Sequence, residues 1–199
     1  MSSKTYSRLR TGLIMAAATA CMVFLAACLP YPLGDPEKSQ VDPAITGFWV
    51  ADQGAQGHFV TVFPHDDRTY VLHYRSFRHN GDRVERDGVS IAKAWLTHIH
   101  GSTFITIEPL EQRLPSFEGK KYYCVMDLDI GEKTISARLL NNEFEGFKNV
   151  ASAQDVADVV AREIDNPKMY QDNRLVFERL DATRDKARIE QLVKTVDGG

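Results

Sequence analysis

The stretch HFVTVFPHDDRTYVLHYRSF, residues 58–77, decides how this chain folds. Apolar and polar side chains alternate through residues 58–63 and again through residues 69–77, which is the pattern of antiparallel strands with one buried face. Between them, Pro64-His65-Asp66-Asp67 is a turn sequence, and Asn80-Gly81 is a strong signal for a two-residue hairpin. The stretch therefore predicts two consecutive antiparallel strands, with a third beginning just after the hairpin.

The same alternation continues on both sides of this stretch. Strands are expected at residues 48–51, 83–97, 103–108, 121–130, 134–140 and 174–180, with Asp87-Gly88 as a bulge. Helical spacing begins after Ser152, which with Asp155 resembles an N-cap and its acidic partner, and a polar amphipathic helix is expected at residues 182–196. We therefore expect a mostly β fold of about eight antiparallel strands closed into an up-and-down barrel, with a helix before the last strand and another at the C-terminus.

The first 27 residues have the parts of a secretory signal. Lys4, Arg8 and Arg10 precede an uncharged apolar stretch, residues 12–27, which is short for a bilayer span of about 20 residues. Residues 1–27 are therefore expected to be a removable leader. Without them the chain has 21 basic and 27 acidic residues, and this balance, with no basic run, argues against nucleic-acid binding.

The leader ends in Leu25-Ala26-Ala27-Cys28, which resembles the lipobox of bacterial lipoproteins. The resemblance implies that Cys28 receives a diacylglyceryl thioether, that signal peptidase II cuts before it, and that the new amino terminus is acylated. Cys21 follows Ala-Thr-Ala and lacks the leucine. Leu29, where inner-membrane lipoproteins of enteric bacteria carry aspartate, implies an outer-membrane protein facing the periplasm. Residues 28–44 hold four of the eight prolines and are expected to form a tether.

A second resemblance concerns the start of the folded domain, expected at residues 45–180. Asp42-Pro43-Ala44-Ile45 reads as a capped single turn, and Gly47-Phe48-Trp49 follows it. A short turn that leads into Gly-x-Trp resembles the start of a lipocalin, and the wider strand pattern resembles small bacterial lipoproteins of uncharacterised function. The lipocalin resemblance implies that Trp49 plugs the closed end of a barrel under a basic residue of the last strand, for which Arg174 and Arg179 are the candidates.

The strands are rich in tyrosine and phenylalanine, and these side chains are the candidates for a ligand site. Tyr70, Leu72 and Tyr74 share one face of their strand by alternation, and Phe104 is expected to join them from a later strand. Two interpretations stay open. The side chains line an apolar cavity for a lipid-like ligand, or they fill the core of the barrel, since an eight-stranded barrel can be solid.

Other polar residues are better explained without chemistry. His98 and His100 are expected at an exposed hairpin end, His65-Asp66-Asp67 in a turn, and Asp127 with Asp129 on a polar strand face. Cys124 lies in an apolar run and is expected to be a small buried side chain. With Cys28 lipidated and Cys21 removed, an internal disulfide is not expected. Because no common catalytic, P-loop or metal motif is present in the sequence, we expect neither an enzyme nor a metal or cofactor.

Three functions remain open at this point. The first is a membrane-anchored envelope lipoprotein whose barrel binds a small apolar ligand or an envelope partner. The second is a structural or assembly accessory of the cell envelope with a packed core and no ligand. The third is a hydrolase whose site the sequence does not reveal. An open cavity would favour the first function, and a filled core with an apolar outer patch would favour the second. A buried contact between a base and a nucleophile would favour the third.

Overall fold

The structure is a computed structural model that describes residues 28–52, 54, 56–80, 83–110 and 121–197. The leader, Gly81 of the expected hairpin and part of the loop before residue 121 lie outside the described residues. None of the described helices is both long enough and apolar enough to span a membrane.

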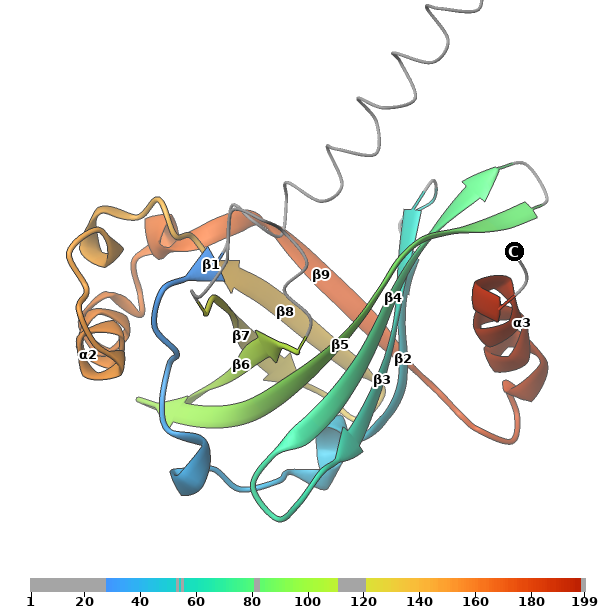
Figure 1. Ribbon diagram of the computed structural model, residues 1–199, viewed down its shortest axis with the longest axis horizontal. Helices are drawn as coiled ribbons and strands as arrows, with labels where there is room; N and C mark the ends of the chain where they lie inside the picture. The colour runs from blue at the N-terminus through green and yellow to red at the C-terminus, as the bar shows by residue number, and fades with distance from the viewer. Residues whose placement is uncertain (1–27, 53, 55, 81–82, 111–120, 198–199) are drawn as a thin grey trace, which may run out of the picture.

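Eight antiparallel strands form one closed barrel (Figure 1). Each strand pairs with the next along the chain, and the last pairs with the first, which confirms the expected up-and-down topology. The barrel strands are β2 (Gly47–Asp52), β3 (Gln56–Pro64), β4 (Tyr70–Asn80), β5 (Arg83–Ile99), β6 (Ser102–Pro109), β7 (Tyr123–Ile130), β8 (Thr134–Leu140) and β9 (Tyr170–Leu180). The expected bulge is also present, because Ser76 pairs with Gly88 and Phe77 with Arg86, which leaves Asp87 as the extra residue.

The two ends of the barrel are defined by its turns. We call the floor the end where β2 begins and where β3 turns into β4, β5 into β6 and β7 into β8. We call the mouth the other end, where β6 ends and where β7 and β9 begin. The inward face is packed with apolar side chains toward the floor, including Trp49, Tyr70, Leu72, Ile105 and Phe177.

A second core lies outside the barrel wall. Helix α2 (Ala153–Glu163) packs through Val156 and Val160 against outward residues of the wall, including Phe104 and Val125 (Figure 1). Ser152 caps this helix, since its Oγ accepts a hydrogen bond from the backbone N–H of Asp155 at 3.1 Å. The short helices η4 (Glu145–Phe147) and η5 (Pro167–Met169) flank it. The expected helix before the last strand is therefore confirmed, and it covers one side of the barrel.

The N-terminal segment, residues 28–45, belongs to the fold. It begins as β1 (Cys28–Leu29), which pairs with β7, and it runs down the outside of the barrel through η1 (Pro36–Lys38) and η2 (Pro43–Ile45) to the floor (Figure 1). Leu29 and Leu33 are only 1% and 0% exposed and lie in the second core. The expectation of a free tether at residues 28–44 is therefore wrong. Pro36 and Pro43 start short helical turns here instead of forming an extended spacer.

One backbone carbonyl fastens this segment to the barrel. The carbonyl oxygen of Leu33 accepts hydrogen bonds from Trp95 Nε1 at 3.1 Å, Thr97 Oγ1 at 3.2 Å and Thr106 Oγ1 at 2.8 Å. All three donors lie on the outward face of β5 and β6. Gly34 follows with a φ of 75°, a conformation that favours glycine, and passes so close to the wall that a Cβ would overlap Thr97 Oγ1.

The C-terminal helix α3 (Lys186–Asp197) covers a different part of the wall. Its Ile189 and Leu192 pack against outward residues of β2, β3 and β4, among them Val50, Phe59 and Phe77. Figure 1 shows α2 and α3 on opposite sides of the barrel. The expected C-terminal helix is confirmed, and it begins four residues later than its sequence pattern indicates.

Candidate functional site

The floor is closed by Trp49 and the turn that precedes it. The indole is buried and its Nε1 donates to the carbonyl oxygen of Ile45 at 2.8 Å. Gly47 has a φ of 128°, which lets the chain turn from η2 into β2, so the Gly-x-Trp spacing has a structural cause. The guanidinium carbon of Arg179 lies 4.4 Å from the centre of the indole ring, and Arg179 also donates to the carbonyl oxygens of Thr46 and Ala44.

Of the two arginine candidates, Arg179 therefore makes the contact that the lipocalin resemblance implied. Arg179 pairs with Trp49 across β9 and β2, which puts both side chains on the inward face. Arg174 is exposed, and the register places it opposite Arg138 on the outward face of β8.

Tyr70 and Leu72 form part of this closed end and do not line an open site. Both are buried in the inner core. The hydroxyl of Tyr70 donates to the carbonyl oxygen of Asp42 at 3.2 Å, and burial raises the pKa of the phenol to about 12. Tyr70 thereby ties the N-terminal segment to the floor. For these two residues the filled-core interpretation is the correct one.

Phe104 was expected beside Tyr70, and this prediction is wrong. Phe104 lies in the second core, on the outer wall under Leu33 and α2. The reason is the pleat: neighbouring positions Thr103 and Ile105 pair with inward residues of β7, so Phe104 between them points outward. Ile105 and Ile107 are the inward residues of this strand that sequence reasoning missed, because β6 is apolar on both faces and alternation alone does not choose between them.

Toward the mouth, several residues of the inward face are half-buried, while Ala51, Cys124 and Leu139 on the same face are buried. The half-buried inward residues in this half are Cys28, His58, Val60, Tyr74, Ser76, Ser90, Ile107 and Leu175. At the floor, Leu128 and Ile130 of the same face are also half-buried. Tyr74 is thus the one expected lining residue that keeps a place in a candidate site. Its hydroxyl lies 2.7 Å from His58 Nδ1, and the two rings are stacked.

The inward side chains of β5 in this half of the barrel are small. Toward the mouth, the inward positions of β5 are Gly88 and Ser90, opposite Ser76 and Tyr74 of β4. Apolar walls with a phenol and an imidazole among them suit a small, mostly apolar molecule that is oriented by one or two hydrogen bonds. The half-buried inward residues are therefore our candidate binding site.

Cys28 lies at the edge of this site, opposite Cys124. The two residues pair across β1 and β7, and their sulfur atoms are 3.6 Å apart. The hydrogen bond from Cys124 lowers the pKa of the Cys28 thiol, while the same bond and burial raise the pKa of Cys124. Directly opposed residues in an antiparallel pair have Cα atoms about 4.5–5.5 Å apart, which is within the span of a disulfide. An unmodified Cys28 can therefore be oxidised with Cys124 by a thiol oxidant, whereas lipidation would occupy the same sulfur.

The other polar candidates lie on the surface. His98 is exposed and hydrogen-bonds Thr103, and His100 lies in the tight turn with a φ of 48°. Asp127 forms an ion pair with Arg138 at 3.1 Å, and this guanidinium stacks on Tyr170. Within the described ranges, no group of three or more potential metal ligands is found.

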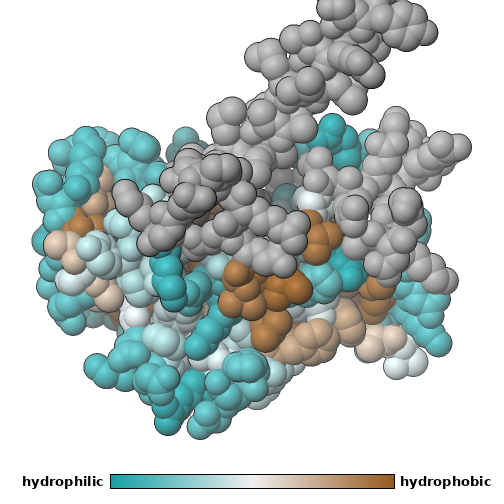
Figure 2. All heavy atoms as spheres, in the orientation of Figure 1, coloured by the Kyte–Doolittle hydropathy of each residue, from teal (hydrophilic) through white to brown (hydrophobic). Residues whose placement is uncertain are grey.

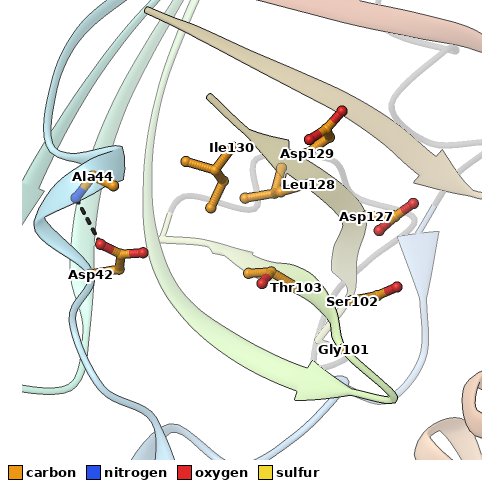
Figure 3. Close-up of a pocket in the computed structure, with 9 residues that line it drawn as sticks. All are labelled: Asp42, Ala44, Gly101, Ser102, Thr103, Asp127, Leu128, Asp129 and Ile130. Carbon is orange, nitrogen blue, oxygen red and sulfur yellow. Dashed lines mark hydrogen bonds between the residues drawn. The ribbon is translucent and has the colours of Figure 1, made fainter. Parts of the chain in front are cut away.

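A hollow of about 550 Å³ lies at the floor and differs from the mouth in chemistry (Figure 3). Asp42, Asp127 and Asp129 contribute carboxylates to its lining, and one carboxylate oxygen of Asp42 is already bound to the backbone N–H of Ala44 at 2.8 Å. The hollow is wide open to solvent and polar, so it does not suit an apolar ligand.

Comparison of the chain with protein-family models, with curated proteins and with solved structures gives no significant match.

Proposed function

We propose that this chain is an envelope lipoprotein, anchored through Cys28, whose barrel holds a small apolar ligand in the half nearest the mouth. The observation that carries this function is the change in burial along the inward face. Trp49 and Tyr70 are buried at the floor, whereas Tyr74 and Leu175 are half-buried toward the mouth. Half-buried side chains on the inside of a barrel are the ones that a small molecule entering by the mouth can contact.

The leader supports the envelope location. A basic start, an uncharged apolar stretch and Leu-Ala-Ala-Cys together are typical of an exported and lipidated chain. Two or three acyl chains on one N-terminal cysteine give stable membrane attachment, while one chain binds only weakly. Leu29 after the cysteine favours the outer membrane as the location.

Ligand binding is tested with the apolar dye N-phenyl-1-naphthylamine and the leaderless chain from residue 28, with Cys28→Ser. We expect fluorescence enhancement with a dissociation constant in the micromolar range, about −8 kcal/mol. Ser90→Trp adds bulk to the inward face and should abolish binding. Val89→Trp is the matched control, because Val89 directly precedes Ser90 on β5 and lies on the outward face.

The two variants also separate the possible locations of the dye. Loss of binding in Ser90→Trp alone supports the site inside the mouth. Loss in Val89→Trp alone places the dye on the outer wall and contradicts the proposal. No binding by the unsubstituted chain favours a second candidate, a structural or assembly accessory of the envelope without a ligand, for which the filled floor is the specific observation.

Anchoring is tested in cells with a fatty-acid probe. Cys28→Ser should remove the label and block maturation by signal peptidase II, whereas Cys21→Ser should leave both unchanged, because only Cys28 follows Leu-Ala-Ala. A Cys28→Ser chain that still carries the label would show that the anchor lies elsewhere.

A further inference from the structure

We infer that the anchored protein stands with its mouth against the membrane and that an apolar patch outside the mouth, formed by Val89, Ile91 and Leu110, contacts the bilayer. This inference rests on the proposed lipidation of Cys28. It adds a definite orientation and a second membrane contact to the anchor alone.

The first argument is that the anchor has no spacer. Leu29, the next residue, is 1% exposed in the second core, and the Leu33 carbonyl is held by three hydrogen bonds. A residue spans at most about 3.6 Å of chain, so a lipid on Cys28 is held within one residue of the barrel wall. The acyl chains can therefore enter the bilayer only if the rim of the barrel at Cys28 comes down to its surface.

The second argument is the position of Cys28 on the barrel. Cys28 pairs with Cys124 near the start of β7, and Cys124 pairs with Ile107 near the end of β6, so all three residues lie in the half of the barrel toward the mouth. The Cys28 side chain packs against the inner core, which means that its sulfur faces the inside of the barrel and not the outer wall. A lipid on this sulfur leaves through the mouth.

The third argument is the patch itself. Val89, Ile91 and Leu110 are 44%, 41% and 58% exposed, and they are three of the five large apolar residues that are exposed in the described part of the chain. Val89 and Ile91 lie on the outward face of β5, and the backbone N–H of Leu110 donates to the carbonyl oxygen of Ile91 at 3.0 Å. In Figure 2, apolar atoms gather on the face along which β5 runs in Figure 1.

The patch and the anchor lie on the same rim of the barrel, three strands apart. Leu110 follows the last residue of β6, and β6 is the neighbour of β7, to which β1 is paired. Neighbouring strands are about 4.8 Å apart, and three strand spacings separate Cys28 on β1 from β5. Two contacts at this separation on one rim prevent the barrel from pivoting freely about its anchor.

The charges beside the patch suit a membrane surface. On the outward face of β4, Arg75 lies opposite Val89, and Lys93 lies two residues after Ile91 on the same face of β5. Glu108 lies opposite Lys93, and its carboxylate is paired with Lys121 at 2.6 Å. Cationic side chains around exposed apolar residues favour binding to anionic headgroups over a neutral surface.

The test uses the full chain with its leader, so that the cell attaches the lipid, in a Cys124→Ser background. The purified mature protein is placed in vesicles of phosphatidylethanolamine and phosphatidylglycerol. A single new cysteine carries an environment-sensitive fluorophore, either at the patch in Leu110→Cys or at the floor in Asp67→Cys. We expect lipids with nitroxide-labelled chains to quench the probe at residue 110 at least threefold more than the probe at residue 67, whose side chain is exposed in the turn between β3 and β4.

A substitution in the patch shows whether the patch makes the contact. In the Leu110→Cys protein, Ile91→Asp should at least halve the quenching while the lipid remains attached. Val176→Asp is the matched control, because Val176 is an exposed β-branched residue on the outward face of β9, away from the patch, and it should leave the quenching unchanged. Both exposed sites tolerate a polar side chain, and circular dichroism verifies the fold. Val89→Asp replaces Ile91→Asp if the latter fails to fold.

The outcomes separate this inference from the proposed function. If mass spectrometry of the mature protein finds no lipid on Cys28, both fail. If the lipid is present but residues 110 and 67 are quenched equally, only the orientation is wrong. If the probe at residue 110 is accessible in vesicles but shielded in native envelopes, the patch binds a protein partner and the membrane contact is overturned.

Discussion

Trp49 and Tyr74 lie on the same inward face, on β2 and β4, and each pairs with Val60 of the strand between them. Trp49 is buried, with its ring N–H bound to Ile45 and Arg179 over its face, whereas Tyr74 is half-buried and its hydroxyl lies beside His58. Because the two residues share a face and the partner Val60, the difference in their burial comes from what covers each side chain. At the floor, the N-terminal segment inserts Ile45 under the barrel.

The largest effect is expected at the floor. Trp49→Ala should lower the free energy of unfolding by about 3–5 kcal/mol, because it removes a fully buried indole and leaves a cavity that the turn at η2 cannot fill. Urea denaturation of the leaderless Cys28→Ser chain from residue 28 measures this change.

Tyr74→Ala is the matched change at the other half of the barrel. Because Tyr74 is half-buried, its truncation should cost about 1–2 kcal/mol, well below the cost at Trp49. Equal losses at the two positions would contradict the difference in burial between Trp49 and Tyr74.

Local sequence predicted the elements because alternation and turn chemistry are local signals. Residues 134–140 were expected to form a strand, and they form β8. The bulge at Asp87-Gly88 was expected because these two residues, which are typical of turns, interrupt a long alternating stretch. Trp49 was assigned to the floor by the Gly-x-Trp spacing. The structure explains this spacing, because the positive φ of Gly47 turns the chain into β2.

Contacts between distant parts of the chain left no such signal. Cys28 and Cys124 are 96 residues apart, and nothing near either residue indicates that they pair. Residues 28–44 have the composition of a linker, yet Leu29 and Leu33 are buried, because only the folded outer wall provides the surface that receives them. The candidate site was predicted only at Tyr74, since burial along one face depends on what caps each end of the barrel.

The second prediction concerns the attachment of the N-terminal segment. Gly34→Ala should destabilise the chain by about 2–3 kcal/mol. The methyl group has to be accommodated at a positive φ, and it displaces Thr97 Oγ1 from the Leu33 carbonyl. Urea denaturation measures the loss.

Gly54→Ala separates the backbone strain at a positive φ from the steric clash with Thr97. Gly54 has a similar φ of 80°, but a Cβ there would meet no atom within 4 Å, so this variant carries the backbone strain alone, about 1–2 kcal/mol. If both glycine variants lose the same stability, the segment is not pressed against the wall at Thr97. The N-terminal segment could then move away from the barrel wall, which would contradict the proposed membrane orientation.

The smallest effect distinguishes the two arginines that the sequence left as alternatives. Arg179→Ala should cost about 1–2 kcal/mol in urea denaturation, because it removes the cation over Trp49 and the hydrogen bonds to the carbonyl oxygens of Thr46 and Ala44. Arg174→Ala, on the exposed outward face, should change stability by less than about 0.5 kcal/mol. In the Trp49→Ala background, the cost of Arg179→Ala should fall, since the ring it covers is gone, and this non-additivity measures the contact directly. Additive losses would mean that Arg179 stabilises the floor through the two carbonyls alone and that the arginine–tryptophan pair has no energetic role in closing the barrel.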